Sequence, residues 1–172
     1  MKARLIFLFS IILTSGCISL SSTQSAEAEV VKVTDGDTVE VLIDGRKETV
    51  RFDGIDTPEV HAENKPKAFE GIKNSQEGKN CLRSYGENAS SYVKQRIGNS
   101  TVRLEYKKGI LAETRGDYGR LLAEIFYDNK SLNQELVEKG LARSYTEEGP
   151  YFEEEVEAKL DMRGVWKCQR VG

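Results

Sequence analysis

The sequence has few of the residues that hold structural metal ions. Its 172 residues contain three cysteines and a single histidine, His61. Structural zinc sites require closely spaced pairs of cysteine or histidine ligands, and the sequence has no such pair. A zinc-dependent fold is therefore not expected.

Positive charge is not in excess either. The chain has 25 basic and 28 acidic residues, which gives a formal net charge of −3. Proteins that hold nucleic acid mainly through long-range charge are usually basic, because neutralising phosphates releases counterions and supplies most non-specific affinity. A passive nucleic-acid scaffold is therefore disfavoured, and any contact with nucleic acid must be local and assisted by a cation.

No apolar run is long enough for a transmembrane helix. Residues 5–13 are mostly apolar and follow Lys2 and Arg4, whereas a lasting transmembrane helix needs about 20 such residues. A short apolar run behind basic residues predicts a signal peptide, here over residues 1–17. The domain is therefore expected outside the cytoplasm.

The end of this signal peptide predicts a lipid anchor. Small residues precede Cys17, as in lipoprotein signals, in which the cysteine becomes the lipidated first residue. Leu13 lies one position further from this cysteine than is usual. The alternative is ordinary cleavage after Ala26-Glu27-Ala28. The first interpretation gives a membrane-anchored lipoprotein and the second a secreted protein.

Two cysteines remain for the folded domain. If Cys17 carries lipid, Cys81 and Cys168 are an even pair in an oxidising compartment, where disulfides persist. A disulfide between them is therefore predicted. The alternative is that they are two unrelated buried thiols.

The rest of the chain divides into a linker and one domain. Residues 18–28 are rich in serine, alanine and glutamate and lack an apolar period, which predicts a linker. The folded domain is expected over residues 29–172. β-Branched runs between turns predict strands, and three-and-four spacing of apolar residues predicts helices. Strands are expected at residues 30–33, 38–43, 49–52, 101–106 and 120–127, and helices at 87–97, after Ser131 and at 151–162.

This order of elements predicts an α+β fold that is mainly β. Three strands, a helix, two strands and two further helices match a five-stranded OB-fold barrel with about three helices, a fold whose strand face and loops bind nucleic acid. Residues 58–85 lack a clear period and predict a long loop, which usually signals function or mobility.

Two acidic clusters accompany the predicted strands. The first, Asp35-Gly36-Asp37-Thr38, is by itself a plausible hairpin turn. The second, Asp53-Gly54-Ile55-Asp56-Thr57-Pro58-Glu59, follows the third strand and could face the first across a curled sheet. Carboxylates that meet at a barrel mouth repel one another, so a cation is expected there. Oxygen ligands suit a hard ion such as Ca²⁺.

Two arginines lie beside these clusters. Arg51 is in the third predicted strand, and Arg120 begins the fifth. Either alone could be an ordinary surface residue. A guanidinium binds phosphate through two parallel hydrogen bonds and stays charged, so a pair of arginines beside an acidic metal site suits phosphodiester cleavage.

Three ordered motifs resemble the staphylococcal nuclease family. They are Val33-Thr34-Asp35-Gly36-Asp37-Thr38-Val39, Val50-Arg51-Phe52-Asp53-Gly54-Ile55-Asp56-Thr57-Pro58-Glu59 and Asp117-Tyr118-Gly119-Arg120. A further stretch, residues 132–142, resembles the family's second helix, so the similarity extends from Val30 to Trp166. The chain departs from the family pattern at Asp117, where a basic residue is frequent, and in a longer loop over residues 63–84.

The resemblance implies a calcium site. Asp37, Asp56 and the carbonyl group of Thr57 would ligate Ca²⁺, and oxygen ligands of this kind suit that ion. Asp35 would support these ligands without binding the ion itself.

The resemblance also implies the residues of catalysis and substrate binding. Glu59 would orient or deprotonate the attacking water as a general base. Arg51 and Arg120 would neutralise charge on the phosphate during attack. Tyr118 and Tyr145 could pack against a bound nucleotide, and the alternative is packing in the core or at its rim.

The expected substrates and partners follow from the same resemblance. They are DNA and RNA, with single strands favoured and products that end in 3′-phosphates, cut by a protein expected to be monomeric. The alternative is a non-catalytic OB-fold module that binds nucleic acid, but such domains typically lose the acidic and arginine residues that are present here. A calcium-binding structural lipoprotein is a third possibility, and it would need neither arginine.

Overall fold

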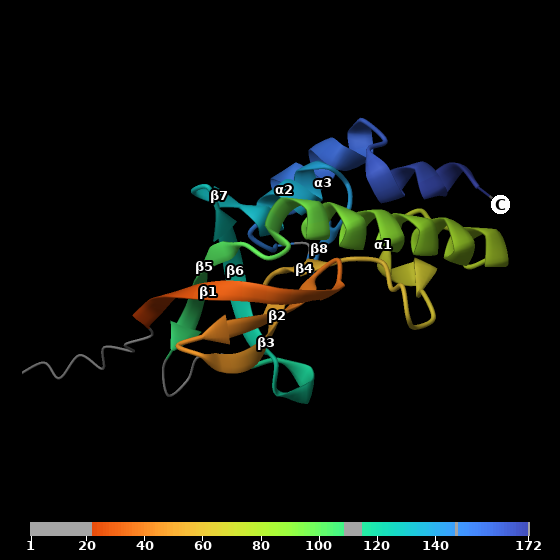
Figure 1. Ribbon diagram of the computed structural model, residues 1–172. Helices are drawn as coiled ribbons and strands as arrows, with labels where there is room; N and C mark the ends of the chain where they lie inside the picture. Colours follow the sequence, from red (N-terminus) through yellow and green to blue (C-terminus); the bar gives the residue numbers. More distant parts are fainter. Residues whose placement is uncertain (1–21, 109–114, 147, 172) are drawn as a thin grey trace, which may run out of the picture.

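Five strands close into a barrel (Figure 1). The computed structural model of the protein describes residues 22–108, 115–146 and 148–171. The barrel strands are β1 (Ser22–Asp35), β2 (Thr38–Ile43), β3 (Arg46–Phe52), β5 (Thr101–Lys108) and β6 (Leu121–Tyr127). The strand order β3-β2-β1-β5-β6 is antiparallel throughout, and a parallel pairing of β3 with β6 closes the ring. This topology confirms the predicted OB-fold barrel.

Helices and short elements connect and cover the barrel strands. The helices are α1 (Gln76–Ile97), α2 (Leu132–Glu138) and α3 (Phe152–Leu160). The short elements are β4 (Ile55–Asp56), β7 (Lys130–Ser131), β8 (Arg143–Ser144) and the 3₁₀ helices η1 (Pro66–Ala68), η2 (Asp117–Gly119) and η3 (Gly164–Arg170). In Figure 1, α1 runs alongside the barrel near β1, and α2 and α3 lie together beyond it.

The barrel core follows from the alternation of side chains along the strands. Val39 and Val41 of β2, Val50 of β3, Leu104 of β5 and Ile125 of β6 are completely buried. Successive residues of a strand point to opposite faces, so these side chains all face the interior of the ring. The β-branched pattern in the sequence therefore sets the inward face of the barrel.

Strand β1 begins earlier than the sequence predicts. It pairs with β5 from Ser22, opposite Lys108, to Glu29, opposite Thr101. The predicted linker over residues 18–28 is therefore wrong from Ser22 onward. These residues are mostly polar and carry no apolar period, so their extended structure comes from backbone hydrogen bonds to β5.

Helix α1 is also longer than predicted. It starts at Gln76, whereas the apolar period predicts a helix only over residues 87–97. The Ser75 side chain caps the helix by accepting a hydrogen bond from the Gly78 amide at 3.1 Å. The predicted loop over residues 58–85 therefore ends at this cap.

The remaining predicted elements lie close to their observed bounds. Strand β2 has the predicted residues, and β3 extends back to Arg46, which pairs with Ile43. The turn between them is Asp44-Gly45, with φ angles of 50° and 74°. Two such left-handed residues are what a tight two-residue hairpin requires, and Asp-Gly is favoured there.

A second, smaller hydrophobic cluster lies outside the barrel. This outer cluster consists of Phe69, Ile72, Leu82, Ala158, Val165, Trp166 and Cys168. A disulfide joins Cys81 of α1 to Cys168 of η3, with 5.8 Å between their Cα atoms. The segment that follows β4 is therefore packed against α1 and the C-terminal part of the chain.

The membrane-related predictions concern the N-terminal end. None of the helices in the described ranges is both long and apolar enough to cross a membrane. The predicted signal peptide over residues 1–17, including the lipidation site Cys17, lies outside the described residues, and so do residues 18–21 of the predicted linker.

Candidate active site

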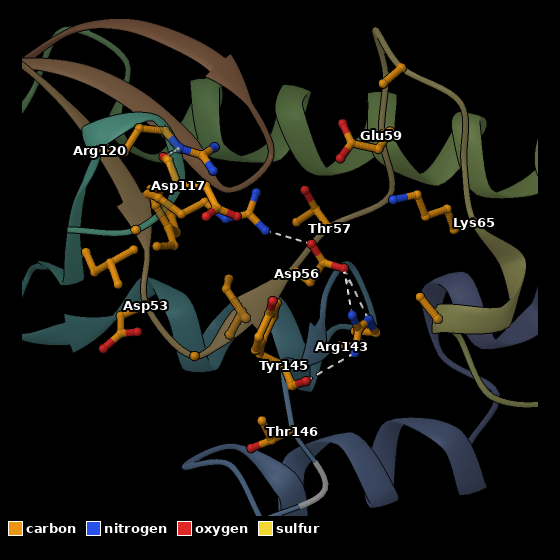
Figure 2. Close-up of a pocket in the computed structure, with 18 of the residues that line it drawn as sticks. Asp53, Asp56, Thr57, Glu59, Lys65, Asp117, Arg120, Arg143, Tyr145 and Thr146 are labelled. Atoms are coloured by element: carbon orange, nitrogen blue, oxygen red, sulfur yellow. Dashed lines mark hydrogen bonds and ion pairs between the residues drawn. The ribbon is translucent and has the colours of Figure 1, made fainter. Parts of the chain in front are cut away.

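One pocket gathers most of the predicted site residues (Figure 2). It has a volume of about 940 Å³ and is lined by residues of β3, β4, β8, η2 and the segments after β4 and β8. The predicted residues that line it are Arg51, Asp56, Thr57, Glu59, Tyr118, Arg120 and Tyr145. Asp35 and Asp37 do not line it.

Asp37 lies buried directly behind the pocket lining. Only 1% of its surface is exposed. Its Oδ2 accepts hydrogen bonds from the amide and the hydroxyl of Thr57, at 2.8 and 3.0 Å. Its Oδ1 accepts from the Thr38 hydroxyl at 3.1 Å and from Arg51. Burial raises the pKa of the Asp37 carboxyl, while Arg51 and the Thr57 amide act in the opposite direction.

Arg51 bridges the two predicted aspartate ligands. One end of its guanidinium group donates to Asp37, and Nη2 donates to Asp56 Oδ1 at 2.6 Å. The arginine side chain is 17% exposed. Strand pairing places it there, because Arg51 of β3 lies opposite Thr38, the first residue of β2. A single cationic group therefore lies between the two carboxylates.

Arg143 holds the other oxygen of Asp56, and the sequence did not predict it as a site residue. Its Nε and Nη2 donate to Asp56 Oδ2 at 3.2 and 3.0 Å (Figure 2). The two residues are cross-strand partners in the short antiparallel pair of β4 and β8. They are 87 residues apart in sequence, so no local spacing could reveal the contact.

The backbone of Glu59 is clamped by a buried asparagine. The Glu59 amide donates to Asn64 Oδ1 at 2.9 Å, and Asn64 Nδ2 donates to the Glu59 carbonyl at 2.8 Å. Asn64 is only 3% exposed. Arg83 of α1 holds the next turn of the segment, through the carbonyls of Val60 and Ala62. The predicted general base is thus on an ordered segment.

The environment of the Glu59 carboxyl favours its protonated form. Burial raises the pKa of Glu59 most, and the carboxylates of Asp35, Asp37 and Asp56 raise it further against the opposing effect of Arg51. A base whose pKa lies closer to the working pH transfers protons more effectively. The shift therefore suits the predicted role.

Arg120 and Tyr118 form a more open edge of the pocket. In the described part of the chain Arg120 has no carboxylate partner: its Nε donates to the Asp117 carbonyl at 3.2 Å. Its guanidinium also lies 5.7 Å from the centre of the Tyr118 ring. Tyr118 is 96% exposed and has a left-handed φ of 62°, which is uncommon for a bulky residue. Arg120 is therefore available to an anion.

Tyr145 and Asp35 lie in different surroundings. Tyr145 lines the pocket, is 62% exposed and donates its amide to the Gly54 carbonyl at 2.8 Å. Asp35 Oδ1 accepts from the Gly36 amide at 2.8 Å and from the Ser90 hydroxyl of α1 at 3.2 Å. Tyr145 can therefore meet a ligand, whereas Asp35 ties the β1–β2 turn to the helix.

The residues around Arg51 fit a divalent cation in part. The guanidinium lies between Asp37 and Asp56 and acts as a stand-in for a cation shared by both carboxylates. The donors are oxygens, which suit Ca²⁺. Across residues 22–108, 115–146 and 148–171, however, no three His, Cys, Asp or Glu side chains are grouped closely enough to hold a metal. A cation here would complete its shell with the Thr57 carbonyl, water or a bound phosphate.

The sequence of the chain is similar to those of known nucleases. The family model described as staphylococcal nuclease homologue matches residues 49–168. The endonuclease YncB of Bacillus subtilis is 35% identical over 139 residues, covering 77% of this chain and 57% of the relative. The prophage-derived endonuclease YokF of B. subtilis is 35% identical over 150 residues, covering 80% and 45%. A thermonuclease of Staphylococcus intermedius is 35% identical over 144 residues, covering 83% and 74%.

The extent of these matches establishes the family. The chain spans about half the length of the two Bacillus relatives. The matched region includes Arg51, Glu59 and Arg120, while Asp35 and Asp37 precede it. The family model covers more than half of the chain, and the thermonuclease match covers most of both proteins. The chain therefore belongs to the staphylococcal nuclease family.

Proposed function

We propose that the protein is a calcium-dependent nuclease that hydrolyses phosphodiester bonds of DNA and RNA, with single strands favoured and 3′-phosphate products. The observation that carries this proposal is the arrangement around Arg51, where two carboxylates share one cationic group beside Glu59 and Arg120. The names of the relatives, endonuclease and thermonuclease, support the same reaction class.

The phosphate would bind between the arginines. Arg120 is free of any carboxylate partner among the described residues, so its guanidinium can form paired hydrogen bonds with phosphate oxygens. Arg51 is engaged with Asp37 and Asp56. When those carboxylates hold a cation instead, Arg51 can turn its donors to the phosphate. Both groups remain charged throughout, so they stabilise the negative charge that builds up during attack.

Glu59 would activate the water. Its carboxylate lines the pocket and has a pKa raised by burial and by the neighbouring carboxylates. Glu59 takes a proton from water as the water oxygen forms a bond to phosphorus. The bond from phosphorus to the 5′-oxygen then breaks, and the 5′-oxygen takes a proton from solvent. The products are a 3′-phosphate and a 5′-hydroxyl.

Asp37, Asp56 and the Thr57 carbonyl would hold the calcium ion. A bound Ca²⁺ supplies Lewis-acid stabilisation of negative charge on the phosphate. Asp37 is fixed for this role by the two hydrogen bonds from Thr57. The side chains that bind the ion are thereby ordered before it arrives.

Digestion of single-stranded DNA and of RNA by the purified full chain tests the proposal. We expect cutting with Ca²⁺, none with a chelator, and a loss of about 10²- to 10³-fold in rate with Glu59→Gln or Arg120→Ala. Polynucleotide kinase should label the products without prior phosphatase treatment, because their 5′ ends carry hydroxyls. A folded protein that binds single-stranded DNA yet never cuts it would identify a non-catalytic binding module instead.

Export is also part of the proposal. A signal peptide over residues 1–17, with lipidation of Cys17 or ordinary cleavage, would place the nuclease outside the cytoplasm. The disulfide between Cys81 and Cys168 supports this, because such bonds persist in oxidising compartments. Metabolic labelling with a fatty-acid analogue distinguishes the routes, since Cys17→Ser abolishes labelling only if Cys17 carries lipid.

A further inference from the structure

The guanidinium group of Arg143 donates several hydrogen bonds within the pocket. Besides its two hydrogen bonds to Asp56 Oδ2, its Nη1 donates to the carbonyls of Ser144 and Tyr145, both at 3.3 Å. Its side chain is 19% exposed. These bonds run in fixed directions from a planar group, so Arg143 is held in one orientation.

Two aromatic rings hold the same guanidinium group. Its central carbon lies 5.6 Å from the centre of the Phe69 ring and 5.7 Å from that of Tyr145. Phe69 is 3% exposed and belongs to the outer cluster. Contacts of a cation with ring faces are favourable. Arg143 therefore connects the outer cluster to the aspartate that faces Arg51.

The two oxygens of Asp56 have separate partners. Oδ1 accepts from Arg51, and Oδ2 accepts from Arg143. Arg51 also donates to Asp37, so its departure frees Asp56 Oδ1 and one acceptor position of Asp37 Oδ1 together. The bonds from Arg143 do not depend on Arg51. They keep Oδ2 in place and leave Oδ1 directed at the position of the Arg51 guanidinium.

We propose that Arg143 is a positioning residue that fixes the Asp56 carboxylate for a divalent cation. This inference rests on the cation site of the proposed function. Partners that orient a metal-binding carboxylate typically contribute 10- to 100-fold to metal affinity. Arg143 acts through Asp56 and touches neither the ion nor the reacting phosphate in this role.

The geometry and the charge of Arg143 have opposite effects, which makes the inference testable. A positive charge beside Asp56 by itself repels a second cation. If Arg143 acted only through charge, Arg143→Lys would bind Ca²⁺ like the wild type, and Arg143→Met would bind it more tightly. If Arg143 positions Asp56, Arg143→Lys binds Ca²⁺ more weakly, because an ammonium group cannot reproduce the planar fork.

Calorimetric titration of the full chain with Ca²⁺, without nucleic acid, measures this difference. The Asp37→Asn variant identifies the heat that belongs to this site. We expect Arg143→Lys to weaken binding about 10-fold or more. Arg120→Lys is the matched control, because Arg120 lines the same pocket without touching Asp56, and its Ca²⁺ affinity should stay unchanged. Thermal unfolding of each variant checks that it is folded.

The outcomes separate the two proposals. Wild-type affinity in Arg143→Lys, or tighter binding in Arg143→Met, overturns the positioning role and leaves the cation site standing. If the wild-type chain shows no Ca²⁺ binding that Asp37→Asn abolishes, both the cation site and the positioning role are overturned. Weaker binding in Arg143→Lys alone, with Arg120→Lys unchanged, supports both.

Discussion

The two sides of the pocket rest on different supports. Arg51 comes from a barrel strand, and Asp37 lies in the turn between two barrel strands that are paired on both sides. Glu59 comes from an irregular segment that is held by Asn64 and, further along, by Phe69 of the outer cluster. One side of the site is thus part of the barrel, whereas the other is attached to it.

Because of this difference, we expect the barrel side of the site to be rigid and the Glu59 segment to be more easily displaced. A closed barrel has every strand paired, so the backbone that carries Asp37 and Arg51 can move only if the ring opens. The Glu59 segment depends on a few side-chain hydrogen bonds, one disulfide and a small apolar cluster. We therefore expect perturbations of the outer cluster to affect the position of Glu59 much more than that of Arg51. The following changes test that expectation.

Removing the disulfide should have the largest effect. The bond closes a loop with a sequence separation of 87, and losing a constraint of that length costs about 4.6 kcal/mol of unfolding free energy in the entropic model. The double variant Cys81→Ser, Cys168→Ser should lose this stability in urea unfolding. Hydrogen exchange should show lost protection around residues 58–75 first. Equal loss of protection in β2 and β3 would contradict the division into two supports.

Arg51→Lys tests the barrel side. The variant keeps the charge but not the fork that spans Asp37 and Asp56, so the rate of DNA cleavage should fall about 10²- to 10³-fold with little change in melting temperature. Arg96→Lys is the control, because Arg96 pairs with Glu135 away from the pocket, and its activity should be retained. Full activity in Arg51→Lys would show that charge alone suffices.

Asn64→Ala tests the attached side with a single side chain. It removes both hydrogen bonds to the Glu59 backbone at a buried position, where lost hydrogen bonds cost about 1 to 3 kcal/mol. We expect kcat to fall about tenfold, with little change in KM. A tenfold change corresponds to about 1.4 kcal/mol, which is at the low end of this range. Asn80→Ala, on the exposed face of α1, should leave kcat unaltered. A pure rise in KM would place Asn64 in substrate binding instead.

Asp35→Asn should produce the smallest effect, on proton affinity. After burial, the Asp35 carboxylate is the largest cause of the raised pKa of Glu59. A negative neighbour favours the protonated form, so neutralising Asp35 should lower the pKa of Glu59 and move its titration to lower pH. NMR titration of the Glu59 carboxyl carbon in chelator measures this, and Asn keeps the oxygen that accepts from Gly36 and Ser90. An unchanged pKa would leave burial as the dominant cause.

Local sequence signals predicted most strands of the barrel well. Strand β2 was predicted at its observed position, because the alternation of side chains along a strand is a property of neighbouring positions. The same signals missed the start of β1 at Ser22 and of α1 at Gln76. Both starts are polar. The start of β1 is stabilised by pairing with β5, which is distant in sequence, whereas the start of α1 is capped by the adjacent Ser75.

The candidate site divides in the same way. Asp37, Arg51 and Glu59 lie in short motifs that can be recognised from the chain alone. Arg143 and Asn64 do not, since an arginine after a helix and an asparagine in a polar segment are ordinary surface residues by pattern. Their roles become visible only through Asp56, paired across β4 and β8, and through the Glu59 backbone.

The sequence by itself determined the inward face of the barrel, its tight turns and the chemical types that a phosphate and a cation require. Only the tertiary structure decided that Arg51 lies between Asp37 and Asp56, and that Arg143 holds the remaining oxygen of Asp56. The reason is physical. Backbone angles and side-chain alternation act between neighbours, whereas hydrogen bonds between charged side chains depend on the register of strands that meet only after the ring has closed.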